Sequence, residues 1–129
     1  MEMIKERYII KHEATLRRAS LRGVSLREVI LRRADLYGAD LYRADLYRAD
    51  LEGANLIGAN LNEANLRDVN LTDANLVRAS LKGANLIGAN LNGANLNGAN
   101  LLGIKIDDGQ GNVYECQKDG WSIIGNIAA

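Results

Sequence analysis

The sequence predicts an all-β protein built as a solenoid, in which the chain coils around its own apolar axis. Leucine occupies every fifth position from Leu16 to Leu101, which makes 18 consecutive leucines. Ala or Val lies two residues before each of these leucines. Phe and Pro are absent and aromatic residues make up 5% of the chain, so aromatic rings cannot dominate the core. Stacked leucines must therefore supply most of the buried apolar surface.

A period of five residues fits neither standard element. On an α-helix it advances about 140° past a full turn, so successive leucines would scatter around the helix. On one continuous strand an odd step would send alternate leucines to opposite faces. Ala and Leu two residues apart do share one face of a short extended segment. We therefore expect short extended segments, each followed by a corner, to repeat as a β-solenoid.

The repeated unit resembles the A(D/N)LXX motif of the pentapeptide-repeat family. It stands in this sequence as Ala34-Asp35-Leu36-Tyr37-Gly38, Ala44-Asp45-Leu46-Tyr47-Arg48 and Ala84-Asn85-Leu86-Ile87-Gly88. The repeats cover residues 14–103, which is most of the chain. The resemblance implies a right-handed quadrilateral β-helix with coils of 20 residues, hence about 4.5 coils in a stack about 22 Å tall.

The charges outside the leucines also favour this coil length. Outward side chains one coil apart should stack, so like charges should avoid each other at that offset. At the two positions after each leucine, an offset of 20 gives four opposite pairs and no like pair: Glu28/Arg48, Arg48/Asp68, Arg43/Glu63 and Arg32/Glu52. The same offset predicts stacking of Arg17 on Tyr37, Arg22 on Tyr42, Arg27 on Tyr47 and Tyr47 on Arg67.

The corners and the residues before the leucines carry further expectations. The second residue after Leu is Gly in nine repeats and charged in nine. Gly permits the positive φ of a type II turn, whereas a charged residue favours another turn, so mixed corner geometry is expected. The Asn residues at 55–75 and 85–100 are expected to bond backbone groups or neighbouring amides.

Both ends of an open solenoid expose sheet edges that need covering. We expect residues 1–13 to form an N-terminal cap and residues 104–129 a C-terminal cap. Turn residues at 108–112 and 119–120 favour a hairpin that pairs residues 113–116 with 121–124. The resemblance adds an alternative, because some members of the family form end-to-end homodimers. The residues expected to make the cap or the dimer contact are Trp121, Ile123, Ile124 and Ile127.

The charges are segregated by coil, although the formal net charge is zero. Residues 14–33 carry six arginines and one glutamate, whereas residues 34–53 carry five acids and two arginines. This basic girdle either contacts phosphate groups or neutralises the acidic coil beside it, and we favour neutralisation. A protein partner could contact the tyrosines and the arginines expected to stack on them. The possible partner surface is Arg17, Arg22, Arg27, Tyr37, Tyr42 and Tyr47.

Catalysis is not expected, because side chains five residues apart diverge on a convex prism instead of meeting in a site. His12 is expected on the surface or in the cap, and Cys116 as a small buried hydrophobe. The sequence contains no P-loop, dinucleotide-binding motif or metal-ligand spacing, so no cofactor or metal is expected. The N-terminal residues resemble neither a signal peptide nor a membrane span, and a single cysteine suits a reducing compartment. We therefore expect a cytoplasmic location.

Two functions follow from these expectations. The first is a non-enzymatic structural or interaction module that binds an unidentified protein, either as a monomer or as an end-to-end homodimer. The resemblance implies many such proteins in cyanobacteria. It also implies the alternative, a DNA mimic that inhibits DNA gyrase, as quinolone-resistance members do. Mimicry needs a continuous acidic surface, whereas this chain is neutral and replaces Asp by Asn before its leucines after residue 50. DNA binding is likewise not expected.

Overall fold

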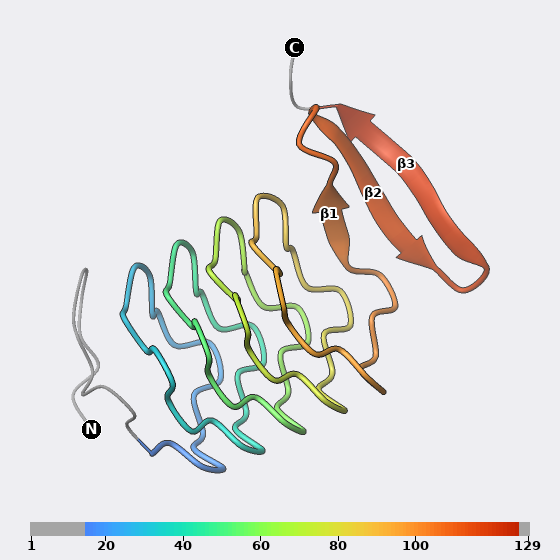
Figure 1. Ribbon diagram of the computed structural model, residues 1–129. Coiled ribbons are helices and arrows are strands. Elements are labelled where there is room, and N and C mark those ends of the chain that lie inside the picture. The colour runs from blue at the N-terminus through green and yellow to red at the C-terminus, as the bar shows by residue number, and fades with distance from the viewer. Residues whose placement is uncertain (1–14, 127–129) are drawn as a thin grey trace.

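The computed structural model describes residues 15–126, which form a stack of coils that ends in a small antiparallel sheet (Figure 1). Isolated parallel bridges join residues 20 apart along the stack, from Thr15 with Asp35 to Asn85 with Lys105. These bridges confirm the predicted coil length. The expected N-terminal cap over 1–13, with His12, lies outside the described residues, as does Ile127.

Each coil has four short extended segments, so the bridges form four ladders on four walls. We number these walls in chain order. Wall 1 carries residues 15, 35, 55, 75 and 95, and wall 2 carries 20, 40, 60, 80 and 100. Wall 3 carries residues 25, 45, 65, 85 and 105, and wall 4 carries 30, 50, 70 and 90. This is the quadrilateral β-helix that the resemblance to the pentapeptide-repeat family implies.

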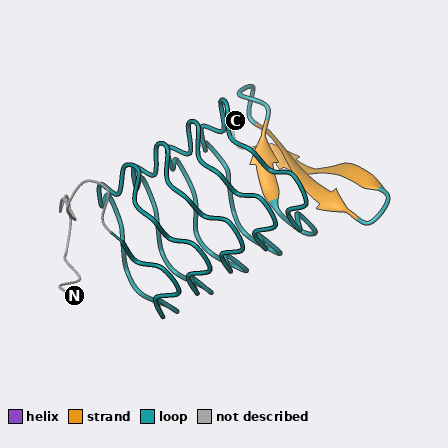
Figure 2. Ribbon diagram, turned by 60° about the horizontal axis from the view of Figure 1, so that its bottom comes forward, coloured by secondary structure: helices purple, strands orange, loops and turns teal. Residues whose placement is uncertain are grey.

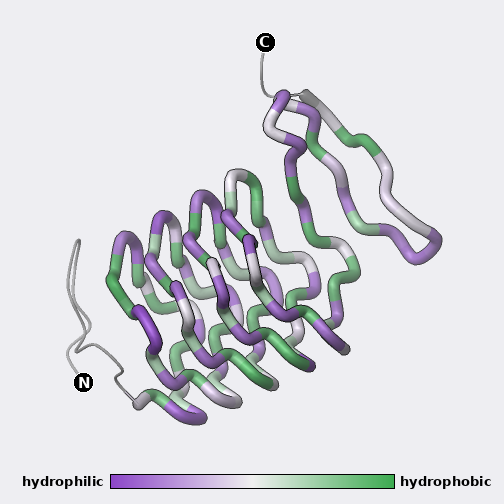
Figure 3. The backbone as a smooth tube through the Cα atoms, in the orientation of Figure 1, coloured by the Kyte–Doolittle hydropathy of each residue, from purple (hydrophilic) through white to green (hydrophobic). Residues whose placement is uncertain are grey.

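The interior is a column of aliphatic side chains. All twelve leucines of the series from Leu26 to Leu81 are 0–1% exposed, and the alanines and valines between them are at most 2% exposed. Within residues 15–126 no polar or charged residue is buried. Along the coils hydrophobic and hydrophilic stretches alternate at short intervals, as the two-residue spacing of Ala and Leu requires (Figure 3).

The expectation of mixed corner geometry is wrong. All 18 corners have a positive φ at the second residue after Leu, between 55° and 60° for the charged residues and between 63° and 79° for Gly. At each corner the N–H three residues after Leu donates to the Leu carbonyl, as Ala19 does to Leu16 at 3.0 Å. Corners from Arg18 to Gly83 also donate their own N–H to the next coil, as Arg18 does to Tyr37 at 2.8 Å. These repeated bonds hold charged residues in a left-handed conformation that they otherwise disfavour.

The named strands lie after the repeats (Figure 2). They are β1 (Lys105–Asp107), β2 (Asn112–Gln117) and β3 (Gly120–Asn126), which form one sheet in the order β1-β2-β3. Both pairings are antiparallel, so β2 and β3 form a hairpin where the sequence predicts one. Because Lys105 also bridges Asn85, this sheet continues wall 3 beyond the last coil.

The hairpin leaves the end of the stack incompletely covered. Trp121, Ile123 and Ile124 are 49%, 65% and 46% exposed, so they do not close the last coil as expected. The reason lies in the backbone: Cys116 accepts a hydrogen bond from Gly103 at 2.8 Å and donates one to Ile104 at 3.0 Å. These bonds hold β2 beside β1 as an extension of one wall, and the sheet does not fold across the other three.

Candidate interaction surface

The arginines that follow the first leucines are paired with the acidic coil. The guanidinium of each one reaches the Asp that precedes the corresponding leucine of the next coil. The four ion pairs are Arg17–Asp35 at 2.8 Å, Arg22–Asp40 at 3.0 Å, Arg27–Asp45 at 3.2 Å and Arg32–Asp50 at 2.6 Å. Sequence reasoning missed these pairs because it compared only the positions after the leucines. The signal was an Arg directly after one leucine and an Asp directly before the leucine one coil later.

Three of these arginines also lie over tyrosine rings, as the sequence predicts. The guanidinium carbon lies 4.5 Å from the ring centroid for Arg17 on Tyr37, 4.5 Å for Arg22 on Tyr42 and 4.6 Å for Arg27 on Tyr47. The fourth expected contact, Tyr47 with Arg67, is not made in the described structure. Arg48 instead lies 5.5 Å from the Tyr47 ring centroid.

Three of the four expected opposite-charge pairs are also present. Arg43 Nε lies 3.0 Å from Glu63 Oε1, the closest approach for Arg48 and Glu28 is 3.8 Å, and that for Arg32 and Glu52 is 4.0 Å. The expected Arg48–Asp68 pair does not form within residues 15–126.

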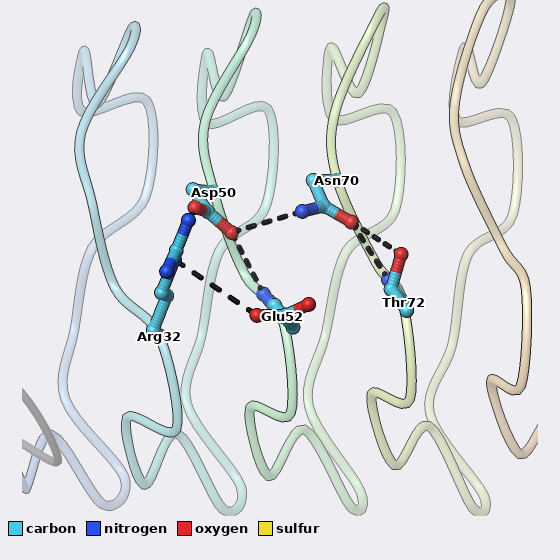
Figure 4. Close-up of polar contacts among 5 residues, drawn as sticks. All are labelled: Arg32, Asp50, Glu52, Asn70 and Thr72. Carbon is cyan, nitrogen blue, oxygen red and sulfur yellow. Dashed lines mark hydrogen bonds and ion pairs between the residues drawn. The ribbon is translucent and has the colours of Figure 1, made fainter.

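A second polar network runs along each ladder, and Figure 4 shows it on wall 4. The Oδ1 atom of Asp50 accepts from the N–H of Glu52 at 3.1 Å and from the Asn70 amide at 3.2 Å. Asn70 Oδ1 in turn accepts from the N–H of Thr72 at 3.0 Å. Most of the Asp and Asn residues that precede a leucine repeat the bond to the N–H two residues on. The expectation that the Asn column bonds backbone groups is therefore confirmed.

These contacts change the pKa of several groups. The hydrogen bond from Arg17 is the main cause that lowers the pKa of Asp35 from its ordinary value of 3.8. The pKa of Asp108, in the loop between β1 and β2, is also lowered, because its carboxylate accepts hydrogen bonds from the Asn112 amide and the Gln110 N–H. Burial raises the pKa of Tyr114, whose hydroxyl faces Asp108. None of these groups is deeply buried, and none lies in an enclosed site.

Four of the six arginines of the basic girdle are therefore paired with carboxylates of the neighbouring coil, which favours neutralisation over a contact with phosphate. The three tyrosines of the possible partner surface follow Asp35, Asp40 and Asp45, which belong to walls 1, 2 and 3. A flat partner cannot touch all three together. Each Arg–Tyr pair belongs to a separate wall.

One wall does gather apolar side chains. Tyr37, Ile57 and Val77 occupy the same outward position in three successive coils, at the turn that ends wall 1, and each is half-buried. A Cβ at the adjacent corner residue Gly58 would have no atom within 4 Å, so the surface beside Ile57 is open. Sequence reasoning missed this stripe, although reading the residues after Leu at an offset of 20 would have found it.

Two open furrows lie on the surface that residues 15–126 form. One open furrow of about 390 Å³ is lined by Arg32, Arg33, Glu52, Gly53 and Asp73. A second, of about 450 Å³, is lined by Tyr42, Asn62, Glu63, Lys82, Gly83, Leu102 and Gly103. Both lie along corners, between coils. Residues 15–126 contain no group of three His, Cys, Asp or Glu side chains placed to hold a metal ion.

Comparison with known proteins gives a consistent result. The family model for pentapeptide repeats matches residues 12–46, 44–83 and 74–107, with eight copies. A pentapeptide repeat protein from the Arabidopsis thaliana thylakoid lumen is 34% identical, with a TM-score of 0.72 over 75% of this chain and 68% of that one. One from Nostoc PCC 7120 is 42% identical, with a TM-score of 0.64 over 65% of this chain and 69% of that one.

The remaining comparisons do not indicate a function. The fluoroquinolone resistance protein QnrB1 is 18% identical, with a TM-score of 0.34 over 81% of this chain and 68% of that one. That likeness is too weak to carry a function. Curated protein sequences give no match. No helix within residues 15–126 has the length and apolar character needed to cross a bilayer.

Proposed function

Because the chain belongs to the pentapeptide-repeat family, we propose that it is a non-enzymatic module that binds a protein partner through wall 1 of its β-helix. The stripe of Tyr37, Ile57 and Val77 carries this proposal. Aromatic residues are enriched at interfaces, and charged side chains are depleted at interface centres. The stripe offers one aromatic ring at its end and two uncharged aliphatic side chains, Ile57 and Val77, beyond it.

The other walls are less suited to an apolar contact. The corresponding outward positions of wall 2 include Arg22 and Lys82, and those of wall 3 include Arg27, Arg67 and Asp107. On wall 4, Arg32 pairs with Asp50 and Glu52. Wall 1 has its own charged residue in this series, Arg17, at one end only. Ile57 and Val77 are therefore open to a partner at little cost of charge desolvation, whereas the guanidinium groups of Arg17 and Arg18 lie over the Tyr37 ring.

Partner capture with matched variants tests the proposed wall. The double variant Ile57→Lys/Val77→Lys places two charges in the stripe, and Thr72→Lys/Asn92→Lys places two charges at equivalent positions of wall 4. We expect one protein to be captured by the wild type and by the wall 4 variant, and to be lost with the wall 1 variant. Equal capture of that protein by both variants would show that the contact lies outside the stripe. If the wild type captures no protein specifically, the proposal is contradicted. Thermal unfolding of each variant verifies that it is folded.

The gyrase alternative has weaker support. Asp35, Asp40 and Asp45 each form an ion pair with an arginine, so they do not present a bare acidic surface. A DNA-supercoiling assay separates the two functions. We expect no inhibition, and inhibition of gyrase at micromolar protein would favour the DNA mimic.

We also propose that the protein acts in the cytoplasm, on the grounds of its sequence. The lumenal location belongs to the Arabidopsis relative. Fractionation of cells that express the tagged protein tests this proposal, and recovery with a lumenal or membrane fraction would contradict it.

A further inference from the structure

We propose that Asn92 and Asn97, in the last coil, are sites of spontaneous deamidation, which converts an Asn side chain to a carboxylate and releases ammonia. Each is followed by a corner glycine, Gly93 or Gly98, and these are the two Asn-Gly pairs of the chain. The reaction begins when the backbone nitrogen of the next residue attacks the side-chain amide carbon. Glycine obstructs that approach least, because it has no Cβ. The sites are separate from the apolar stripe and do not depend on the proposed partner.

The side chains of Asn92 and Asn97 are exposed and free to turn. Within residues 15–126 their amide groups make no hydrogen bond. The Asn residues that precede the leucines behave differently: Asn90 and Asn95 each accept a bond from the N–H two residues further on, at 3.0 Å. An amide without such a bond can swing towards the backbone without losing one.

The attacking nitrogen is also free at these two corners. In earlier coils the corner N–H donates to the next coil, as Glu63 does to the Lys82 carbonyl at 2.8 Å. In the part of the chain that the structure describes, the N–H groups of Gly93 and Gly98 have no acceptor. The reason is that the ladders of walls 4 and 1 end in this coil.

The bonds that hold each Asn–Gly peptide decide how readily it reacts. In a turn with a positive φ at the glycine, this peptide must rotate before its nitrogen can face the side-chain carbon. The peptide between Asn62 and Glu63 is held twice: the Asn62 carbonyl accepts from the Arg43 N–H at 3.0 Å, and the Glu63 N–H donates to the next coil. The Asn92 carbonyl accepts from the Asp73 N–H at 2.9 Å, and this peptide has no second bond among residues 15–126. The last coil therefore permits the rotation at a smaller cost than an interior coil.

The reaction consumes only water. The Gly93 nitrogen loses its proton and bonds to the side-chain carbon of Asn92, and the bond from that carbon to the amide nitrogen breaks. The amide nitrogen takes up a proton and leaves as ammonia, which closes a five-membered imide. Water then opens the imide. Attack at the side-chain carbonyl gives Asp, whereas attack at the main-chain carbonyl gives isoaspartate, whose backbone runs through the side-chain carbon.

Both products change the last coil. No charged residue occurs between Lys82 and Lys105, so two new carboxylates make an uncharged end of the stack acidic. Isoaspartate also lengthens the backbone of the corner by one carbon. At position 92 this displaces the carbonyl that accepts from the Asp73 N–H, which is the bond that ties the peptide to the preceding coil. The modified coil should therefore be held less firmly on the stack.

Peptide mapping by mass spectrometry tests the proposal on the full chain, incubated folded at neutral pH and digested briefly. Trypsin cleaves after Lys82 and Lys105, so both sites fall in one peptide with four Asn residues that precede leucines. We expect fragment ions to show the mass gain of deamidation at Asn92 and Asn97. The four other Asn residues are the internal control and should keep their mass. An unchanged mass at both Asn92 and Asn97 would overturn the proposal.

Glu63→Gly separates the effect of the structure from that of the sequence, because it creates an Asn-Gly pair at Asn62 in an interior corner. Glycine stands at nine of the 18 corners, so the corner accepts it, and thermal unfolding verifies the fold. Asn62 Oδ1 also accepts from the Lys82 N–H at 2.9 Å. In the folded variant Asn62 should deamidate at least about tenfold more slowly than Asn92, because it must break at least one more hydrogen bond.

The same variant unfolded in urea supplies the reference rates. There the two Asn-Gly pairs should react equally fast, because no hydrogen bond holds either of them. Equal rates for Asn62 and Asn92 in the folded variant would contradict the role of the open last coil and overturn the proposal.

Discussion

At the scale of single residues, the corners show how one coil constrains the next. Several corner side chains lie over the corner glycine of the following coil. The Cγ atom of Arg33 lies 3.3 Å from the place that a Cβ on Gly53 would occupy, and that of Arg78 lies 3.2 Å from the same point at Gly98. Glycine therefore serves two purposes at these corners. It adopts the positive φ easily, and it leaves room for the side chain of the preceding coil.

Two glycine substitutions separate these purposes. Gly58→Ala adds a Cβ in open space, so it should cost only the left-handed strain of a non-glycine residue, about 1–2 kcal/mol. Gly88→Ala adds a Cβ that collides with Oδ1 of Asp68, so its cost should exceed that of Gly58→Ala by the energy needed to turn the Asp68 carboxylate aside. Urea unfolding of the two variants measures the difference. Equal losses of stability would contradict the role of space at Gly88, and Asp68→Ala in the Gly88→Ala background should recover part of the loss.

The Arg17–Asp35 pair predicts a dependence of stability on pH. The folded-state pKa of Asp35 lies below its ordinary value of 3.8, so folding is stabilised while the carboxyl stays ionised. This contribution is complete above the unfolded-state pKa and is lost as pH falls through the lower folded-state pKa. NMR titration of the carboxyl carbons should place the pKa of Asp35 below 3.8 in the wild type and nearer to 3.8 in Arg17→Gln. An unshifted Asp35 in the wild type would rule out the pairing in solution.

At the scale of elements, the ladders act as the stabilising units between coils. Their ion pairs are exposed: the side chains of Arg48 and Glu28 are 57% and 36% accessible. Each exposed ion pair typically adds less than about 1 kcal/mol to the free energy of unfolding, and it adds less still at high salt. The backbone bonds and the leucines must supply most of the cohesion between coils. The charges mainly favour one stacking register over others.

Reversal of one ladder charge tests that register. Arg48→Glu replaces an attractive contact with Glu28 by a repulsive one. It should therefore lower the free energy of unfolding by up to about 1 kcal/mol at low salt, and by less at high salt. Arg67→Glu is the matched control, because Arg67 makes no ion pair within residues 15–126. Thermal unfolding at two salt concentrations measures both variants. Identical behaviour of the two would argue against the Glu28–Arg48 contact.

The sequence predicts these elements unequally well. The leucine column follows from the period of five alone. The coil length of 20 residues is implied by the resemblance to the pentapeptide-repeat family, and the charges favour it. The left-handed charged corners could not be predicted from local preference, because Arg18 and Glu28 adopt a positive φ only where bonds to the next coil hold them there. The exposure of Trp121 and Ile123 depends on whether the hairpin extends a wall or crosses the end. Residue types do not reveal that choice.

At the scale of the whole molecule, the described residues combine an apolar interior with polar outer walls. Its formal net charge is zero, and its basic and acidic coils neutralise each other locally. Such a surface offers flat walls as contacts. The proposed function uses the apolar stripe beside one of these walls.

The inward column of leucines is the central claim, and one pair of variants tests it most directly. Leu66 is fully buried in the middle of the stack, whereas Ile87 lies outward and half-buried at the position after Leu86. The free energy of unfolding in urea should fall by several kcal/mol in Leu66→Lys, because an unpaired ammonium group is forced into the column, and only slightly in Ile87→Lys. Equal stability of Leu66→Lys and the wild type would contradict the account.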